Sequence, residues 1–348
     1  MLTRVARWVL HVDLDEFIAA VEVLRHPELA DEPVVVGGDG DPTKRGVVST
    51  ANYVARRFGI GSAMPLRTAY KRCPEAVFLP VDEAAYLEAS GRVMDALRSF
   101  DGVVQVLGWD EAFMGVAASD PEELARSVQT RVFDETKLWC SIGVGDTKLR
   151  AKLASGFAKP RGVFMLTREN WAFVMDAQPV EALWGIGTKT ARKLHMLGIR
   201  LVEQLASADE ALLAEAFGPR TGPWLRELAT GEGSAEVSDA PHVARGHGRE
   251  RTFQQDLTDP EEIRREVSRL AHELMEDIRA EGRPVVRVVV KVRFAPFFTK
   301  QHGVKLAEST EDGRTIEAGA QAALGKFELN RPLRLLGVRA EFESHKEI

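Results

Sequence analysis

The sequence predicts a multidomain protein of the α+β class. At 348 residues the chain exceeds the size at which a single hydrophobic core usually stops growing, so we expect two or more domains. The first half alternates short apolar runs with amphipathic helical patterns, and a separate module of helices and strands follows a Gly/Ser/Ala-rich segment at 231–248. The composition, with 45% hydrophobic and 28% charged residues, is typical of a soluble globular protein.

The sequence carries no sign of a membrane or secreted protein. No apolar run reaches the length of a membrane span. The N-terminus has a basic start and a short apolar stretch, but His11 and Asp13 interrupt it too early for a signal peptide. Cys73 and Cys140 lie far apart, without the spacing of a disulfide framework or a zinc site. We therefore expect a cytoplasmic protein with reduced, structural cysteines.

The first part of the chain predicts one sheet covered by helices. Helices are expected from Phe17, near residues 84–100 and from Pro121, and strands are expected at WVLHV, PVVVG, VVQVLGW, EAFMGV and KLWCSIGVG. Between Asp41 and Cys73 the pattern becomes short, Gly-rich and basic, which predicts a small inserted subdomain.

The second part predicts a helical region, a linker and a compact module. Residues 166–231 are helical with Gly and Pro breaks, and the segment at 231–248 lacks large apolar residues, as linkers do. Beyond it we expect a charged helix near 260–281, strands at VVRVVVKVRF and RPLRLLGVRAEF, and a second helix near IEAGAQAALGKF.

Two acidic sites interrupt apolar strands. Asp13 and Asp15 end the first strand, and Asp15 is placed to cap the helix that follows, so Asp13 is the ligand candidate. Asp110 and Glu111 join two apolar runs, where adjacent carboxylates repel one another unless a cation offsets them. Either pair alone is typical of a cap or a solvated turn. Together they favour an oxygen-ligand site for Mg²⁺ or Mn²⁺.

Other residues near these acids have ordinary explanations. His11, alone at the strand end, is expected to be packed or solvated rather than a ligand. The run GGDGDPTKRG lacks the spacing of a phosphate-binding loop and predicts a turn.

Three groups of cations suggest phosphate partners. GDTKLRAKLASGFAKPRG places Lys148, Arg150, Lys152 and Lys159 around a helix, and Tyr53, Arg56 and Arg57 lie in the inserted subdomain. This combination suits a triphosphate, although cations at a helix end also complement the helix dipole.

A nucleic-acid backbone is the partner that the other two groups suggest. LWGIGTKTARKLHMLGI predicts a helix, a turn with Gly185 and Gly187, and a second helix with Lys189, whose amides suit one backbone phosphate. A tight helical hairpin needs glycines anyway. In VVRVVVKVRF, Arg287, Lys291 and Arg293 share one face, although cations also protect edge strands. Residues 282–307 hold six cations and no acid, more than edge protection requires, despite a net charge of −6 for the chain.

At this point the motifs resemble those of the Y-family translesion DNA polymerases of the DinB, or DNA polymerase IV, type. The resemblance spans nearly the whole chain, from about Trp8 to Phe342. It rests on HVDLDEFIAAVE, STANYVARRFGIGSAMPLRTAYKRCP, CSIGVGDTKLRAKLASGFAKPRG, LWGIGTKTARKLHMLGI, GRERTFQQDLTD and RPLRLLGV, in that order. It implies a right-hand polymerase with a palm at 1–40 and 76–166, fingers at 41–75, a thumb at 167–231, a linker at 232–244 and a little finger at 245–345.

The resemblance also implies the roles of individual residues. Asp13, Asp110 and Glu111, with the Leu14 carbonyl, would hold two Mg²⁺ ions, for which Mn²⁺ would substitute. The nucleotide contacts would be Thr50, Tyr53, Arg56, Lys159 and the amides of Phe17 and Ile18. The DNA contacts would come from Gly185, Gly187, Lys189, Arg287, Lys291 and Arg293. The expected partners are primer-template DNA and a dNTP, and the enzyme is expected to be a monomer.

Several positions depart from the family pattern. The SxDE box is GWDE here, and the SYEAR glutamate is Val54. Ile18 stands where an aromatic ring usually excludes the 2′-hydroxyl of the incoming nucleotide, so rNTPs are expected as substrates too, unless Ile18 is simply a core residue of its helix. The sequence ends FESHKEI, without a recognisable peptide for a sliding clamp, so distributive synthesis is expected.

Two other functions compete with this interpretation. A non-catalytic DNA-binding relative would lack the acids, and all three are present. A nucleotidyl cyclase would not need a phosphate-binding hairpin followed by a basic module.

Overall fold

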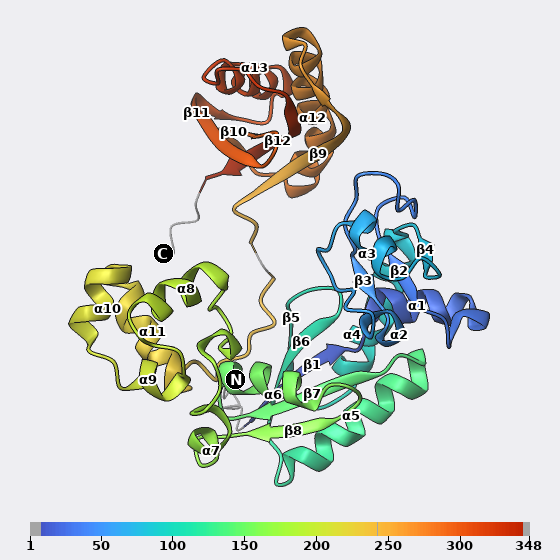
Figure 1. Ribbon diagram of the computed structural model, residues 1–348, viewed down its shortest axis with the longest axis vertical. Coiled ribbons are helices and arrows are strands. Elements are labelled where there is room, and N and C mark those ends of the chain that lie inside the picture. Colours follow the sequence, from blue (N-terminus) through green and yellow to red (C-terminus); the bar gives the residue numbers. More distant parts are fainter. Residues whose placement is uncertain (1–7, 242, 344–348) are drawn as a thin grey trace. The chain divides into compact units, whose positions relative to one another are not determined.

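The computed structural model describes residues 8–241 and 243–343, so the expectations for the N-terminal start and for the residues after Glu343 lie outside the described residues. The described residues form two compact units. The first runs to Pro42 and continues through Gly46–Ala240, and the second comprises Thr43–Arg45 with the chain from Pro241 onward. We describe each unit by itself (Figure 1).

A five-stranded sheet forms the centre of the first unit, with the order β5-β6-β1-β7-β8. Neighbours are antiparallel except for the parallel pair β7 and β8. Alternate residues of β1 point to opposite sides, as the period of a strand requires: Leu10 and Val12 enter the main core, and Val9 packs against Ala151. The strands are β1 (Trp8–Leu14), β5 (Val103–Val106), β6 (Glu111–Val116), β7 (Cys140–Gly145) and β8 (Val163–Leu166).

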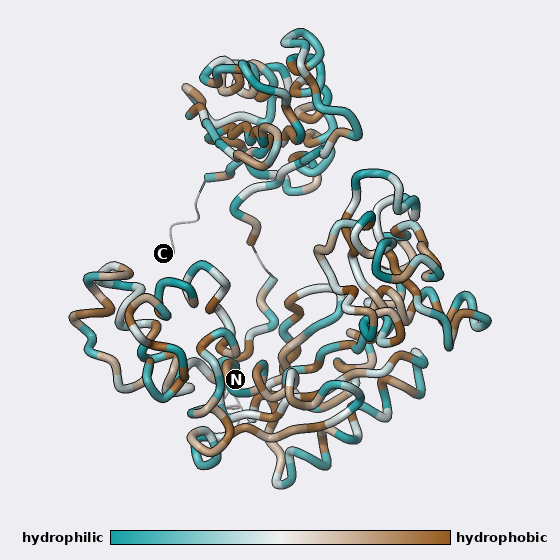
Figure 2. The backbone as a smooth tube through the Cα atoms, in the orientation of Figure 1, coloured by the Kyte–Doolittle hydropathy of each residue, from teal (hydrophilic) through white to brown (hydrophobic). Residues whose placement is uncertain are grey.

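Four helices cover this sheet. Three of them contribute apolar residues to the main core, and α6 packs on β7, β8 and β1. Around these helices hydrophobic and hydrophilic residues alternate, as amphipathic helices require (Figure 2). Their bounds are α1 (Phe17–Arg25), followed by the 3-10 turn Pro27–Leu29, α4 (Glu83–Arg98), α5 (Pro121–Thr136) and α6 (Lys148–Ala158).

The inserted subdomain and the strands that flank it form a small separate sheet, which corrects one prediction. The run PVVVG was expected in the main sheet, but β2 pairs in parallel with β4 and antiparallel with β3. A short apolar run fits either sheet, and only its tertiary partners decide between them. The elements are β2 (Val34–Val36), β3 (Thr50–Ala51), α2 (Tyr53–Arg56), α3 (Leu66–Arg72) and β4 (Val77–Leu79).

Short helices complete the first unit. The predicted Gly-x-Gly hairpin has an α-helix only on its second side, because the segment before Gly185 is a 3-10 turn. The helical prediction for that first arm was therefore wrong. The elements are α7 (Trp171–Met175), the 3-10 turn Val180–Ala182, α8 (Thr188–Met196), α9 (Val202–Ala206), α10 (Glu210–Phe217) and α11 (Thr221–Ala229).

The predicted linker has no regular secondary structure before β9 among its described residues. Its first part nevertheless packs on the first unit. The Lys148 amide donates to the Ser234 carbonyl at 2.9 Å, and Ala235 and Val237 contact the cluster of Val9, Phe113 and Ala151.

The second unit is a four-stranded sheet with two helices on one face. The strand order is β11-β10-β12-β9, all antiparallel. The predicted alternation of β10 is confirmed, since Val288, Val290, Val292 and Phe294 enter the core beneath the helices. The sequence analysis did not predict β9 or β11. The elements are β9 (Gly246–Leu257), α12 (Pro260–Glu281), β10 (Val285–Phe294), β11 (Phe298–Thr310), α13 (Gly313–Leu324) and β12 (Leu333–Phe342).

Among the described residues, the search for a helix with the length and apolar character of a membrane span finds none.

Candidate active site

Strand pairing brings the predicted acids together. Asp13 in β1 lies directly opposite Glu111, the first residue of β6. The Leu14 amide donates to the Asp110 carbonyl at 2.8 Å, which holds the end of the β5–β6 hairpin against the end of β1. The strand register thus brings Asp13 and Glu111 together at one end of the sheet, with Asp110 next to Glu111 in the chain, although Asp110 is not in the group whose ligand atoms lie within 4.8 Å of one another.

Two lysines from the region of α6 neutralise these acids. The Lys159 ammonium lies 2.5 Å from an Asp13 oxygen, and the Lys152 ammonium lies 2.5 Å from a Glu111 oxygen. The sequence named Lys152 among the cations suited to a triphosphate, but not as a partner of the acids. Lys152 lies in α6 and Lys159 directly follows the end of that helix.

Arg150 does not join this group, although the sequence placed it there. It is buried, it forms an ion pair with Asp146 at 2.9 Å, and its guanidinium lies over the Trp171 ring. Its charge is therefore balanced by Asp146 within the protein.

The environment shifts the pKa values of Asp110 and Glu111 in opposite directions. Partial desolvation and then the charge of Asp13 raise the pKa of the Asp110 carboxyl. Hydrogen bonding with His11, and then the Lys152 ammonium, lower the pKa of Glu111 to about 2 against the opposing effect of burial. Crowded carboxylates of this kind are what a bound cation stabilises.

His11 is a packed histidine, as expected from the sequence. It is fully buried, its Nδ1 lies 2.8 Å from Ser155 Oγ, and its ring packs edge-on against Phe113. Its Nε2 lies 3.3 Å from a Glu111 oxygen, so it also fixes the position of that carboxylate. Burial lowers the pKa of His11.

Asp15 is not the helix cap that the sequence predicted. The residue before α1 is Glu16, at φ 46°, and no side chain caps the helix. Asp15 instead accepts hydrogen bonds from Ser141 Oγ at 2.9 Å, the Tyr53 hydroxyl at 3.0 Å and the Arg161 amide at 2.8 Å. These donors come from distant segments, which a local sequence pattern does not reveal.

The uncapped start of α1 leaves backbone donors available. The amides of Phe17 and Ile18 have no acceptor among the described residues, and such amides at a helix start favour an anion. The Phe17 side chain is buried, whereas Ile18 is partly buried against the main core of the first unit. Helix α1 also contacts β3, which carries Thr50.

The other predicted nucleotide contacts lie on β3 and α2. Thr50 is partly buried. The Arg56 Nε donates to the Ala51 carbonyl at 2.9 Å, and its guanidinium lies 4.9 Å from the centre of the Tyr53 ring. The Tyr53 hydroxyl is engaged with Asp15, and burial followed by that carboxylate raises its pKa.

The carboxylate oxygens fit a divalent cation. Ligand atoms of His11, Asp13 and Glu111 lie within 4.8 Å of one another. His11 Nδ1 contacts Ser155 and its Nε2 lies 3.3 Å from both Glu111 and Lys152, so the remaining donors are carboxylate oxygens, which suit Mg²⁺ or Mn²⁺. The two lysine ammoniums already occupy positions beside these oxygens that a cation would favour.

The sequence matches the impB/mucB/samB family over residues 12–156 and the C-terminal domain of that family over residues 244–342. The chain belongs to the impB/mucB/samB family. It is 49% identical to "DNA polymerase IV 2" of Mycobacterium tuberculosis (strain ATCC 25618 / H37Rv) over 345 residues, which cover 98% of this chain and 99% of that protein. It is 38% identical to DNA polymerase IV of Methanoculleus marisnigri, with 97% and 95% covered.

Solved structures agree with this relationship. A Y-family DNA polymerase chimera of Dbh and Dpo4 matches with a TM-score of 0.85 at 25% identity, covering 96% of this chain and 98% of that one. An insertion ternary complex of Dbh DNA polymerase matches with a TM-score of 0.67 at the same identity and coverage. The protein is therefore a DNA-directed DNA polymerase of the Y family, with palm, thumb and little-finger domains, and this family uses divalent metal ions.

The predicted hairpin lies between the 3-10 turn Val180–Ala182 and α8. Gly185 has φ +102°, and a Cβ added there would lie 3.1 Å from the Trp224 ring. Gly187 precedes α8 without a side-chain cap, and Lys189 is exposed in the first turn of that helix.

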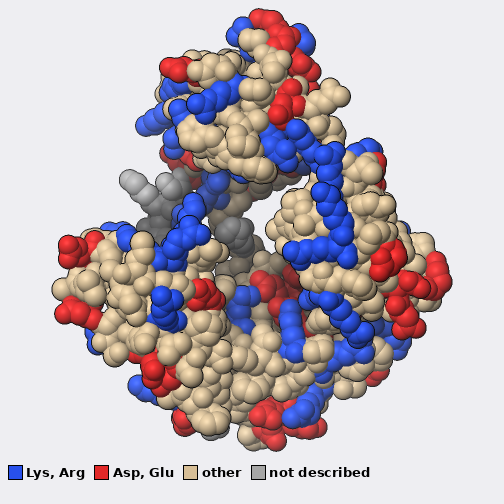
Figure 3. All heavy atoms as spheres, in the orientation of Figure 1, with Lys and Arg blue, Asp and Glu red and all other residues tan. Residues whose placement is uncertain are grey.

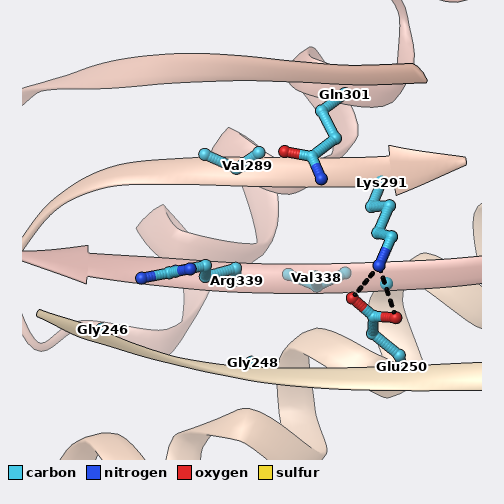
Figure 4. A pocket seen from close by; sticks show the side chains of 9 residues that line it. Gly246, Gly248, Glu250, Val289, Lys291, Gln301, Val338 and Arg339 are labelled. Carbon is cyan, nitrogen blue, oxygen red and sulfur yellow. Dashed lines mark hydrogen bonds and ion pairs between the residues drawn. The ribbon is translucent and has the colours of Figure 1, made fainter. Parts of the chain in front are cut away.

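The second unit carries three predicted cations on the open face of its sheet. The edge-strand alternative is wrong, because β10 lies between β11 and β12. A shallow pocket on this face is lined by Gly246, Gly248 and Gly337, which leave room beside the strands (Figure 4). Lys291 forms an ion pair with Glu250 across this pocket at 2.8 Å, and Arg287 pairs with Glu341 at 3.3 Å.

The surface of the second unit carries charges of both signs. In Figure 3, Asp and Glu of this unit gather over α12, while Lys and Arg gather nearer to the sheet. Arg293 makes no ion pair with a described acid, and its Nε donates to Thr299 Oγ1 at 3.0 Å.

Proposed function

We propose that this polymerase performs template-directed, error-prone translesion synthesis by a two-metal mechanism. Asp13, Asp110, Glu111 and the Leu14 carbonyl would hold two Mg²⁺ ions, for which Mn²⁺ would substitute. Such ions activate a primer 3′-hydroxyl and stabilise the leaving pyrophosphate. The observation that carries this proposal is the strand register that places Asp13 opposite Glu111, with Asp110 beside them.

The surrounding residues would bind and orient the nucleotide. When nucleotide and metal enter, Lys159 is free to exchange its Asp13 partner for a phosphate oxygen. The amides of Phe17 and Ile18 would receive another phosphate oxygen, and Thr50, Tyr53 and Arg56 would contact the triphosphate from the fingers. Lys152 and His11 would keep the Glu111 carboxylate in place throughout.

The experiment is primer extension with single-substitution variants. Asp13→Asn, Asp110→Asn and Glu111→Gln are expected to abolish incorporation while DNA binding persists, because these side chains serve the metal. Asp134→Asn, an exposed acid on α5, is the matched control and should keep full activity. An active Asp110→Asn enzyme at high Mg²⁺ would contradict the site assignment. Loss of DNA binding in all three variants would contradict their purely catalytic role.

We further propose that rNTPs are substrates as well as dNTPs. The support is Ile18, an aliphatic side chain that is only partly buried at the start of α1, a helix that contacts β3. Such a side chain reaches less far toward the C2′ of a bound nucleotide than a phenyl ring would.

Domain roles follow from the same proposal. The palm would comprise 1–40 and 76–166, the fingers 41–75, the thumb 167–231 and the little finger 245–345, joined to the thumb by 232–244. Primer-template DNA would contact the thumb hairpin and the open face of the little-finger sheet.

All proposed ligands come from one chain, which supports a monomer. The intact set of acids disfavours a non-catalytic recruitment role.

A further inference from the structure

The tip of the β10–β11 hairpin presents an aromatic ring to solvent. Residues 295–297 connect the two strands, and Phe297 at this tip is 66% exposed. The neighbouring Phe298 is 49% exposed. Large exposed rings at a hairpin tip contribute nothing to the core, so they point to a binding surface.

Two guanidinium groups lie over the Phe297 ring. The Arg334 guanidinium carbon is 4.8 Å from the ring centre, and that of Arg293 is 5.9 Å away. Arg334 reaches this position through an irregularity in the sheet, because Phe294 pairs with Leu333 while Arg293 pairs with Leu335. The register thus skips Arg334, and an extra residue of this kind redirects its side chain.

Positive charge dominates around this ring. The segments 291–300 and 331–336 contain Lys291, Arg293, Lys300, Arg331 and Arg334 and no acid. Burial and then repulsion from Arg45 and Arg293 lower the pKa of Arg334, and Asp256 is the single carboxylate that opposes them among the charges acting on it. Because these cations repel one another beside an exposed ring, an anion from outside the protein would stabilise them.

We propose that Phe297, Arg334 and Arg293 form a stacking site for an unpaired base of single-stranded DNA, with the guanidiniums contacting the adjoining phosphates. Bases stack on aromatic rings and on guanidinium planes, and single-strand binding sites combine such rings with cations. A duplex fits less well, because its bases are already stacked on one another. The site adjoins the open sheet face and shares Arg293 with it, but elsewhere on that face the cations would contact phosphates alone.

The test compares two single-stranded probes of equal charge. Full-length protein is titrated, without nucleotide or divalent ions, with dT12 and with a 12-mer of abasic sites that has phosphates but no bases. The wild type should prefer dT12. Phe297→Leu should reduce that preference by roughly 5- to 150-fold, since stacking on one ring contributes that much. Arg334→Gln should weaken the binding of both probes.

The matched control is Phe173→Leu in α7, a 94% exposed phenylalanine with no described cation over its ring. It should leave both affinities unchanged. An unchanged dT12 preference in Phe297→Leu, or an equal loss for both probes, would overturn the proposal. Binding of polyglutamate as tight as that of dT12, and lost in Phe297→Leu, would also overturn it and indicate an acidic polypeptide partner. Because no catalysis is measured, these outcomes are independent of the two-metal proposal.

Discussion

Ile18 is the residue at which sugar selection can be tested most directly. In Ile18→Phe the ring would extend toward the C2′ of the nucleotide, and forcing a hydroxyl into a packed site costs about 1–3 kcal/mol. We therefore expect kcat/KM for rNTPs to fall by roughly 10- to 200-fold, with little change for dNTPs. Steady-state insertion kinetics of both nucleotides measure this ratio.

The control for this experiment is Ile18→Leu, which keeps an aliphatic side chain of equal size. It should retain the wild-type ratio. If the wild type already excludes rNTPs, or if the phenyl ring fails to restore exclusion, sugar selection depends on other residues.

At the same scale, the sequence predicted residues whose role follows from local pattern and missed those defined by distant neighbours. Asp13 and Glu111 could be found because each ends or begins an apolar strand. Asp15 and Arg150 could not be assigned, because their partners, Ser141 and Trp171 among them, reach them only through the fold. Their burial depends on the tertiary structure and not on the local sequence.

At the scale of elements, the thumb turn offers a matched pair of glycines. Gly185→Ala should destabilise the protein by about 1–2 kcal/mol, because an L-residue is strained at positive φ and the new Cβ would press on Trp224. It should also weaken DNA binding. Gly187→Ala is the control for stability, since its φ is −84° and an added Cβ meets nothing within 4 Å. Urea unfolding and DNA titration test both variants, and equal effects would argue against the turn geometry described above.

The open face of the little-finger sheet makes a prediction about salt. Lys291 is paired with Glu250 before DNA arrives, so a phosphate must displace that acid. Glu250→Gln should therefore tighten DNA binding and steepen the plot of log K against log salt by up to about 0.9. The measurement is a titration of primer-template at several salt concentrations.

Neutralising Arg287, Lys291 and Arg293 together should do the opposite, weakening binding to all sequences alike. Unchanged salt slopes in both variants would show that DNA does not lie on this face. These expectations depend on β10 being an interior strand, which the sequence left open because cations on a strand suit an edge as well.

Elements with strong periodicity were the most predictable. The helices from Phe17 and from Pro121 begin at the expected residues. The strand β9 was missed because its residues are mostly polar and it pairs with β12 at a sheet edge, with Arg249 and Arg251 bound to α12. A strand that is defined by such contacts has no hydrophobic alternation to reveal it.

For the whole molecule, the division into two units predicts independent folding. The core of the second unit is formed entirely by residues between Leu257 and Phe342. We expect a fragment of residues 241–348 to fold alone, with a cooperative thermal transition followed by circular dichroism. The same transition should appear in the full chain beside that of the first unit. A fragment without cooperative unfolding would show that this core depends on the rest of the chain.

Ile18 and the acids belong to different elements: the acids to β1 and the β5–β6 hairpin, the isoleucine to α1. A substitution at position 18 therefore alters one helix face and leaves untouched the strand pairing that holds Asp13 opposite Glu111. If Ile18 sets sugar selection as proposed, substrate range and catalytic power are separable traits in this enzyme. A lineage would then move between precursors of DNA and of RNA by changing a single codon, without altering the strand pairing of the acids.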